Sequence, residues 1–131
     1  MVKIIGAGPG AKDLITVRGM RALQEADVII YAGSLVNEEL LEYAKKECEI
    51  YNSAYMNLDE VIDVIVKAEQ EGKKVVRLHT GDPSIYGAIR EQMDILDEKI
   101  LLMITVRCQC ILRCCKCPES GIYSAGYFPR V

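Results

Sequence analysis

The sequence predicts an α/β fold: an open, mostly parallel sheet with helices on both faces. Short apolar runs alternate along the chain with segments whose apolar residues recur at helical spacing. The runs are apolar at most positions rather than at every second one, as is typical of parallel strands buried on both sides. Two of the runs end in a glycine-rich turn, the kind of loop at which open α/β sheets bind ligands.

The expected strands follow from these runs. Residues 2–5 and 28–31 give two strands, residues 74–78 a third and residues 48–51 a shorter one. At 131 residues, 50% of them hydrophobic, the chain can form one domain with a core of its own.

Capping residues locate the first two helices. Thr16 caps a helix that runs to Ala26. Four apolar side chains of this segment are expected on one face: Val17, Met20, Leu23 and Ala26. Asn37 begins a second helix, with acidic residues in its first turn, where the helix dipole favours them.

Two further helices are expected downstream. Asn57 and Glu60 have the spacing of a capping box, and the helix that follows ends at Gly72. Its apolar stripe consists of Val61, Ile62, Val64, Ile65 and Ala68. The last helix is expected from Ser84 to about Leu96.

Both glycine-rich loops follow strands. The first, Gly6-Ala7-Gly8-Pro9-Gly10, comes after residues 2–5. The second, His79-Thr80-Gly81-Asp82-Pro83-Ser84-Ile85-Tyr86-Gly87-Ala88, comes after residues 74–78. Because the carboxyl ends of parallel strands lie at one edge of a sheet, we expect a single site built from both loops.

A dinucleotide site is an alternative for the first loop. Gly6, Gly8 and Ala11 satisfy the loose glycine pattern of such sites. However, Pro9 has no amide hydrogen to offer a phosphate, and a helix that begins near Thr16 starts too late to sit under a pyrophosphate. No acid ends the second strand, where such sites bind the ribose. These mismatches disfavour a nicotinamide-dependent oxidoreductase.

Composition restricts the partners. A net charge of −3 argues against a general nucleic-acid-binding protein. The longest apolar run, residues 100–106, is far shorter than the roughly 20 residues of a membrane helix. No signal peptide precedes the first strand. We therefore expect a cytoplasmic protein without a nucleic-acid or membrane partner.

Several motifs together resemble those of the tetrapyrrole (corrin/porphyrin) methylases. The family's signatures are matched by the first loop with Asp13-Leu14-Ile15-Thr16, by Ala26-Asp27-Val28-Ile29-Ile30-Tyr31, and by Gly81-Asp82-Pro83 with Tyr86-Gly87. Residues 31–36, 51–54 and 77–88 are similar to the branch of this family that methylates ring carbon 11 of precorrin-4 in cobalamin synthesis. The resemblance covers residues 1 to about 98.

The resemblance implies an activity and a site. It implies methyl transfer from S-adenosylmethionine to precorrin-4 or cobalt-precorrin-4, and a homodimer in intact members. The implied cofactor-binding residues are Pro9, Thr80, Gly81, Asp82, Pro83 and Ile85. The implied substrate-binding residues are Gly8, Gly10, Ser34, Leu35, Val36 and Tyr86. It implies no metal and leaves the catalytic residue unassigned.

Three of the motif residues also have simpler structural interpretations. Asp82 precedes a proline and is a common turn residue on its own. His79, the only histidine, is either a base or a hydrogen-bonded packing residue. Tyr86 would merely pack on the sheet.

The sequence departs from the family's pattern after residue 98. Five of the six cysteines crowd into residues 108–117. Residues 114–117 have a CxxC spacing, which leaves a small zinc module as an alternative, but no histidine follows. Members of the family continue instead with an alanine-rich helix and a second α/β domain that supplies much of the cofactor pocket.

We therefore expect residues 1–98 to form the N-terminal methylase domain and residues 99–131 to be an aberrant tail translated out of frame. Codons for residues 107–130, read one nucleotide later, can encode a stretch similar to the family's turn and alanine-rich helix. The cysteines then arise where alanine codons are read in the wrong register. On this interpretation the second domain is missing and activity is impaired. A non-catalytic fragment, or a sibling methylase acting on another precorrin, is the alternative.

The coding DNA tests the interpretation of the tail. We expect a second open frame downstream of the codon for residue 98, with an insertion or deletion among the codons for residues 99–106, since a single shift there would produce a stop codon. Sequencing the gene shows whether this frame exists. A gene with no alternative frame, or a tail that holds one metal ion with four cysteines, would contradict the interpretation.

Overall fold

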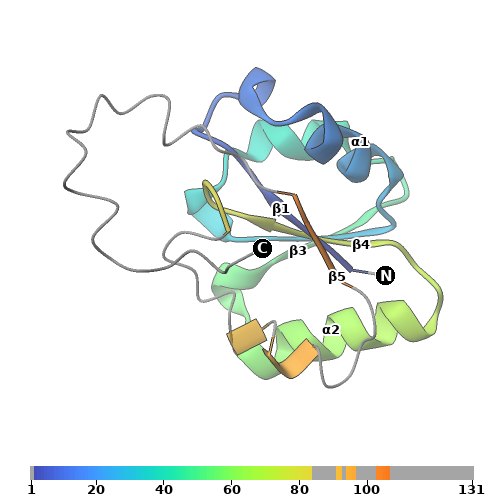
Figure 1. Ribbon diagram of the computed structural model, residues 1–131. Coiled ribbons are helices and arrows are strands. Elements are labelled where there is room, and N and C mark those ends of the chain that lie inside the picture. Colours follow the sequence, from blue (N-terminus) through green and yellow to red (C-terminus); the bar gives the residue numbers. More distant parts are fainter. Residues whose placement is uncertain (1, 84–90, 93, 97–102, 107–131) are drawn as a thin grey trace, which may run out of the picture.

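The chain forms an open parallel sheet, as predicted. The structure is a computed structural model that describes residues 2–83, 91, 92, 94–96 and 103–106. Five parallel strands lie in the order β3-β2-β4-β1-β5 (Figure 1). Their bounds are Val2–Gly6 for β1, Val28–Tyr31 for β2, Glu49–Asn52 for β3, Val75–His79 for β4 and Met103–Val106 for β5.

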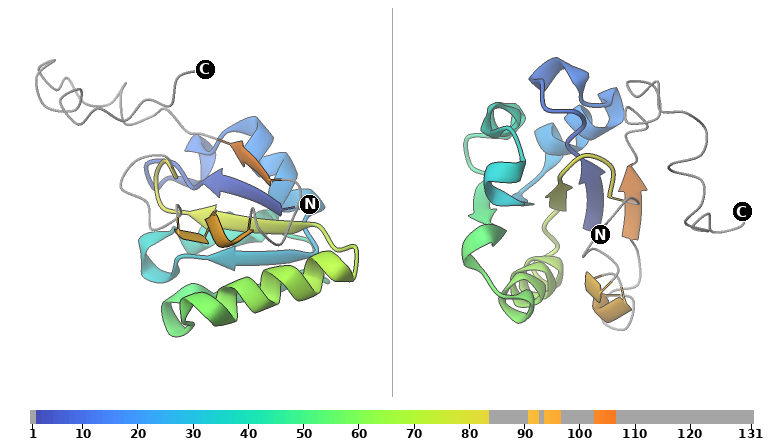
Figure 2. Two further views of the ribbon diagram at one scale, coloured as in Figure 1. Left: turned by 60° about the horizontal axis from the view of Figure 1, so that its bottom comes forward. Right: turned by 90° about the vertical axis from the view of Figure 1, so that its left-hand side faces the viewer.

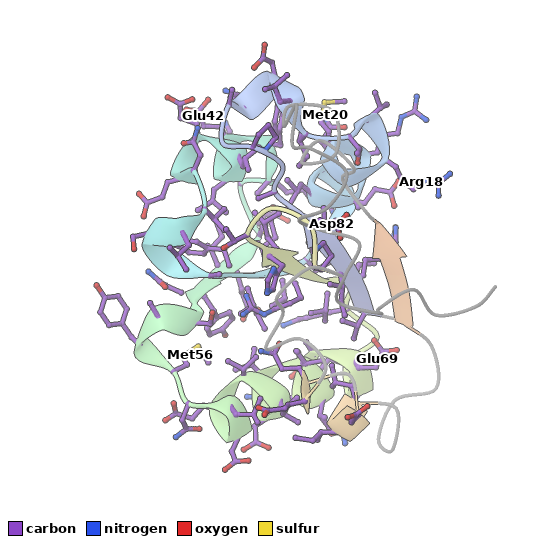
Figure 3. All side chains as sticks on the ribbon, turned by 60° about the vertical axis from the view of Figure 1, so that its left-hand side comes forward. Arg18, Met20, Glu42, Met56, Glu69 and Asp82 are labelled. Atoms are coloured by element: carbon purple, nitrogen blue, oxygen red, sulfur yellow. The ribbon has the colours of Figure 1, made fainter. Side chains whose placement is uncertain are left out.

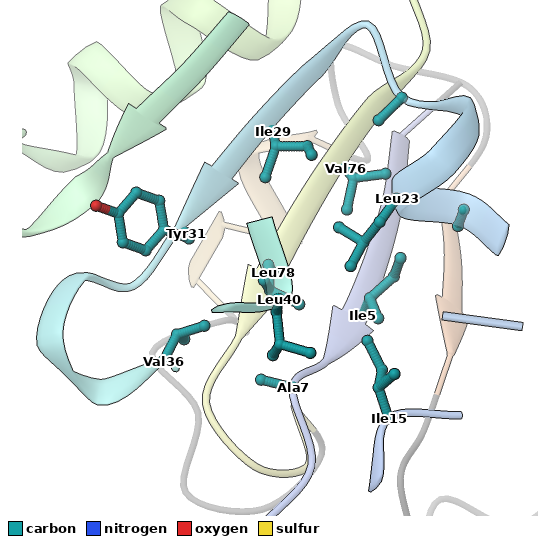
Figure 4. Packing of buried hydrophobic residues seen from close by; sticks show 12 residues of the cluster. Ile5, Ala7, Ile15, Leu23, Ile29, Tyr31, Val36, Leu40, Val76 and Leu78 are labelled. Carbon is teal, nitrogen blue, oxygen red and sulfur yellow. The ribbon is translucent and has the colours of Figure 1, made fainter. Parts of the chain in front are cut away.

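Helices cover both faces of the sheet (Figures 1 and 2). On one face lie α1 (Val17–Glu25) and the 3₁₀ helix η3 (Glu38–Tyr43); on the other lies α2 (Leu58–Gln70). The core layer under α1 includes Ile5, Leu23, Ile29, Leu40, Val76 and Leu78 (Figure 4). The layer under α2 includes Val2, Val28, Ile30, Ile62, Ile65 and Val75.

The first helix begins where the sequence predicts, but its buried face is shifted. Thr16 caps α1, because its Oγ1 accepts a hydrogen bond from Gly19 N at 3.0 Å. The expectation that Val17 lies on the buried face is wrong, since Val17 is 61% exposed. The helix approaches the sheet through Gly19, where an added Cβ would lie 3.0 Å from Ile5 Cγ2. At the helical rotation per residue, Val17 points about 200° away from Gly19 and toward solvent.

The segment after Asn37 is helical, as expected, but it is a 3₁₀ helix. Asn37 Oδ1 accepts a hydrogen bond from Glu39 N at 3.0 Å and so caps η3. Glu38 lies beside Glu39 in the first turn, and Leu40 is fully buried beneath the segment. The short 3₁₀ geometry suffices to place that one side chain in the core.

The capping box of α2 is confirmed. Glu60 N donates to Asn57 Oδ1 at 2.9 Å, and Asn57 N donates to Glu60 Oε2 at 2.8 Å. Of the expected apolar stripe, Val64 is only half-buried and the other members are buried. Gly72, with φ 71°, follows the end of the helix.

The two edge strands of the sheet differ from the sequence-based expectation. The strand expected at 48–51 begins at Glu49, and β3 forms one edge of the sheet. The other edge, β5, is not among the strands expected from the sequence, and it pairs with β1.

Of the helix expected from Ser84 to about Leu96, residues 91, 92 and 94–96 are helical. Ile85, Tyr86 and the tail at 107–131, with its five cysteines, lie outside the described residues. In the described part of the chain, no helix has the length and apolar character to cross a membrane.

Asp27 joins the amino ends of three strands. Its carboxylate accepts hydrogen bonds from Lys74 N and from Lys45 Nζ, each at 2.9 Å. Its main chain donates to Lys74 O and accepts from Glu49 N, also at 2.9 Å each. These contacts lower the pKa of Asp27, the bond from the Lys74 backbone amide being the largest cause, followed by that from Lys45.

The stabilisation by Asp27 should depend on pH. Because the folded pKa lies below the unfolded value of about 3.9, the carboxylate stabilises the fold fully above that pH. The stabilisation is lost as the pH falls through the folded pKa. We expect Asp27→Asn to lower the free energy of unfolding at pH 7, with a difference from wild type that shrinks below about pH 4.

Urea denaturation at several pH values measures this difference. Asp63→Asn, at an exposed position on α2, is the matched control and should show no such pH-dependent difference. A constant difference between Asp27→Asn and wild type from pH 7 to pH 3 would contradict the assignment.

Candidate functional site

The two glycine loops meet over the carboxyl ends of β1 and β4, which are neighbours at the centre of the sheet. Ala7 N donates to His79 O at 2.7 Å, and Gly8 N donates to Gly81 O at 3.3 Å. Gly8 and Gly81 form an antiparallel bridge. The prediction that both loops lie on one edge is therefore confirmed for their described residues.

A close approach of main chains holds the loops in this arrangement. A Cβ added to Gly6 would collide with the carbonyl oxygen of Gly81 and would lie 3.0 Å from Pro83 Cδ. Gly8 and Gly81 both have positive φ, 77° and 57°, a conformation that glycine adopts without strain. The glycines at these positions thus follow from geometry.

The expected cofactor-binding residues divide by exposure. Asp82 and Pro83 are buried, with Asp82 4% exposed where the chain turns over the end of the sheet (Figure 3). Thr80 and Gly81 are half-buried, whereas Pro9 is exposed on the first loop. The structure brings these five together through the bridged loops, and Ile85 lies outside the described residues.

The expected substrate-binding residues include a turn after β2. Gly33–Leu35 form the 3₁₀ helix η2, in which Ser34 and Leu35 are exposed, Leu35 by 72%. Val36 has its side chain in the core layer under α1, so it supports the turn from below. Asn37 Nδ2 donates to Gly10 O at 2.8 Å and so ties this turn to the first glycine loop.

A second turn packs against η2. Ser53–Tyr55, the 3₁₀ helix η4, follows β3. Gly33 has φ 61°, and a Cβ added there would lie 2.7 Å from Ala54 Cβ. Leu35 and Tyr55 are the most exposed of the large apolar residues in the described part, Tyr55 by 88%. The carboxyl edge of the sheet therefore carries exposed apolar side chains beside the glycine loops.

Sequence reasoning missed Arg77. It lies inside the apolar run of β4, yet it is 5% exposed and its guanidinium is fully engaged. Nε donates to Gln92 Oε1 at 3.2 Å, Nη2 to Ser53 Oγ at 3.0 Å and Nη1 to Ile30 O at 3.1 Å and, more weakly, to Leu78 O at 3.4 Å. Burial lowers the pKa of Arg77 to about 10. A charged residue in an otherwise apolar strand was the available signal.

His79 lies at the end of β4 and is half-buried. Its Nδ1 is 2.9 Å from Thr80 O. Because a carbonyl oxygen only accepts, Nδ1 carries the hydrogen, and in the neutral ring Nε2 is left as an acceptor. The histidine therefore both braces the loop and offers one hydrogen-bond acceptor. Among the described residues, no three His, Cys, Asp or Glu side chains gather so that they could hold a metal ion.

Comparisons with known proteins agree with the motifs. The sequence model of the tetrapyrrole (corrin/porphyrin) methylases matches residues 1–103. A cobalt-precorrin-4 C(11)-methyltransferase of Methanocaldococcus jannaschii is 72% identical over 97 residues, which are 74% of this chain and 38% of that protein. The chain thus spans about two-fifths of the length of this relative.

Two solved structures share the fold. The X-ray structure of a cobalamin biosynthetic enzyme, cobalt precorrin-4 methyltransferase, matches with a TM-score of 0.78 and 47% identity, over 81% of this chain and 44% of that one. The uroporphyrin-III C-methyl transferase of Thermus thermophilus, complexed with S-adenyl homocysteine, matches with a TM-score of 0.68 and 30% identity, over 81% and 43%. Because the family's sequence model matches residues 1–103, well over half of the chain, the chain belongs to the tetrapyrrole (corrin/porphyrin) methylases.

Proposed function

We propose that this chain is the N-terminal domain of an S-adenosylmethionine-dependent methyltransferase. The enzyme acts on ring carbon 11 of cobalt-precorrin-4 or precorrin-4 in cobalamin biosynthesis. The observation that carries the proposal is the bridge between Gly8 and Gly81, which joins the two family loops into one surface at the end of the sheet. The 72% identical relative is named for this reaction.

The second glycine loop fits the cofactor. A relative was solved with S-adenyl homocysteine bound. In this chain the absence of a side chain at Gly6 lets the main chains of the two loops pack closely. The residues proposed to hold the cofactor are Pro9, Thr80, Gly81, Asp82, Pro83 and Ile85. Pro9 has no amide hydrogen to offer a phosphate group, which is in keeping with a cofactor that has none.

The substrate is proposed to lie along the exposed turn after β2. Leu35 is 72% exposed beside the glycine loops, and an apolar rim of this kind suits the flat face of a macrocycle. Asn37 fixes the spacing of this rim from the first loop through its bond to Gly10 O. The residues proposed to border the substrate are Gly8, Gly10, Ser34, Leu35, Val36 and Tyr86, with Val36 contributing its main chain because its side chain lies in the core.

The proposed methyl transfer depends mainly on how the methyl donor and the ring carbon are oriented toward each other. S-adenosylmethionine supplies an electrophilic methyl group on a sulfonium, so no metal ion is needed. The chain's loops would hold the ring carbon in line with that methyl group, which is the part of the barrier that positioning can lower. In the neutral ring, His79 Nε2 is a hydrogen-bond acceptor at the same edge of the sheet.

A second candidate function is that of a fragment that binds without turnover. The chain spans 38% of the length of the 72% identical relative. We further propose that the intact protein is a cytoplasmic homodimer that does not bind nucleic acid. Binding of S-adenosylhomocysteine by the purified chain, followed by calorimetry, separates a binding domain from a chain that only retains the motifs.

Asp82 should be critical for cofactor binding. In a version of the chain extended to the length of its relatives, Asp82→Ala should weaken S-adenosylhomocysteine binding or turnover by about tenfold or more, because Asp82 and Pro83 set the shape of the loop. Calorimetry measures the affinity, and Asp63→Ala on the exposed side of α2 is the control. Unchanged binding and turnover would return Asp82 to the role of a turn residue. Turnover of uroporphyrinogen III alone would contradict the proposed substrate.

Gly6 should be required for stability and binding together. Gly6→Ala should cost about 1–3 kcal/mol of unfolding free energy, since its Cβ overlaps the Gly81 carbonyl, and should weaken S-adenosylhomocysteine binding. Gly72→Ala is the matched control: it is strained by its φ of 71° but has no atom within 4 Å of the added Cβ. It should lower stability and leave binding intact. Equal affinities of Gly6→Ala and wild type for S-adenosylhomocysteine would show that binding does not require the close contact between the two loops.

A further inference from the structure

Arg77 connects three segments at the carboxyl edge of the sheet. It lies in β4, two residues before the second glycine loop. Ser53 begins η4, which packs on η2, and Ile30 lies near the end of β2, the strand that leads into η2. Gln92 lies in the helical residues that follow the loop. One guanidinium thus contacts Gln92 beyond the second glycine loop, the carbonyl of Ile30 in β2, and Ser53 of η4, the turn that packs against the proposed substrate-side turn η2.

The bond to Gln92 closes the second loop. Arg77 precedes the loop and Gln92 follows it, so the 3.2 Å contact between Nε and Oε1 joins the residues on either side of the loop. On the other side, Nη2 donates to Ser53 Oγ at 3.0 Å, and that hydroxyl donates to Tyr31 O at 2.9 Å. A continuous chain of hydrogen bonds therefore runs from the helix after the cofactor loop to the end of β2.

The partners of Arg77 are all neutral. Within the described residues its hydrogen bonds go to two carbonyl oxygens, a hydroxyl and an amide. A buried cation without a carboxylate is a costly way to stabilise a sheet, and well-packed apolar side chains often do this at least as well. What the planar guanidinium supplies is several donors in fixed directions. Donors in fixed directions suit a residue that holds neighbouring segments in a defined position.

We propose that Arg77 is a positioning residue that holds the second glycine loop, the proposed cofactor loop, at a fixed distance from η4 and so from the substrate-side turn η2 that packs against it, acting through Gln92 and Ser53. The inference rests on the proposed function for the identity of the ligands. It assigns a role to a residue that belongs to neither expected binding set. Arg77 itself is buried beneath the site and acts through its partners.

Hydrogen exchange tests the positioning without any ligand. Gln92→Ala and Ser53→Ala each remove one acceptor, and we expect the Ala7 and Gly8 amides, which bond to the second loop, to exchange about tenfold faster in either variant. Asp27→Asn is the matched control, because it loosens the opposite ends of the same strands. It should speed exchange of the Lys74 amide, which donates to the Asp27 carboxylate, and leave Ala7 and Gly8 unchanged. Unchanged exchange at Ala7 and Gly8 in both test variants would overturn the proposal.

Calorimetry with S-adenosylhomocysteine on the 131-residue chain supplies the functional arm. Gln92→Ala and Ser53→Ala should bind about tenfold more weakly than wild type, and Asp27→Asn should bind equally well. Arg77→Lys keeps the positive charge but loses the planar guanidinium with its several donors. It should therefore weaken S-adenosylhomocysteine binding as much as Gln92→Ala does. Wild-type affinity in the test variants, or in Arg77→Lys, would overturn the proposal. If wild type does not bind the probe while the exchange result holds, the proposed function fails and the positioning role stands.

Discussion

The contact between the loops after β1 and β4 is the constraint on which the site depends. The strands are central and parallel, so their carboxyl ends lie side by side. Their loops can close on each other only because Gly6 has no side chain where the Gly81 carbonyl passes. Once the Gly8–Gly81 bridge forms, the two loops become one surface. The apolar core holds the strands in place, and the bridge fixes the positions of the two loops relative to each other.

The two ends of the sheet are held by different kinds of interaction. At the amino end, exposed ion pairs such as Lys45–Asp27 and Lys73–Glu49 lie in water, where each contributes little and salt screens it. At the carboxyl end, Arg77 is buried with neutral acceptors, where geometry is strict and a lost partner is costly. The buried polar contacts of Arg77, which require the strictest geometry, therefore lie at the edge that carries the loops.

Local signals made most of the fold predictable. Thr16 and the Asn57–Glu60 pair act through bonds within one turn of helix, so sequence spacing alone revealed them. The exposure of Val17 could not be read this way, because it depends on how closely α1 approaches β1 at Gly19. The loops were found from their glycines, but Arg77 was not, since its partners come from segments 15 to 47 residues away. Long-range polar contacts leave no periodic pattern in a sequence.

The strand order explains why this edge needs additional bonds. The connection after β1 leads through α1 on one face of the sheet, whereas the chain after β4 leads to Leu96, which packs in the core layer under α2 on the other face. Adjacent strands whose connections leave to opposite faces open a crevice between their loops, which is where open α/β sheets bind ligands. The elements that follow the two loops pack in different core layers. The main-chain bond at Gly8 joins the loops directly, and the bond between Arg77 and Gln92 joins β4 to the helical residues after the second loop. On the proposed function, loops joined in this way would hold the methyl donor and its acceptor in contact, which is what methyl transfer requires.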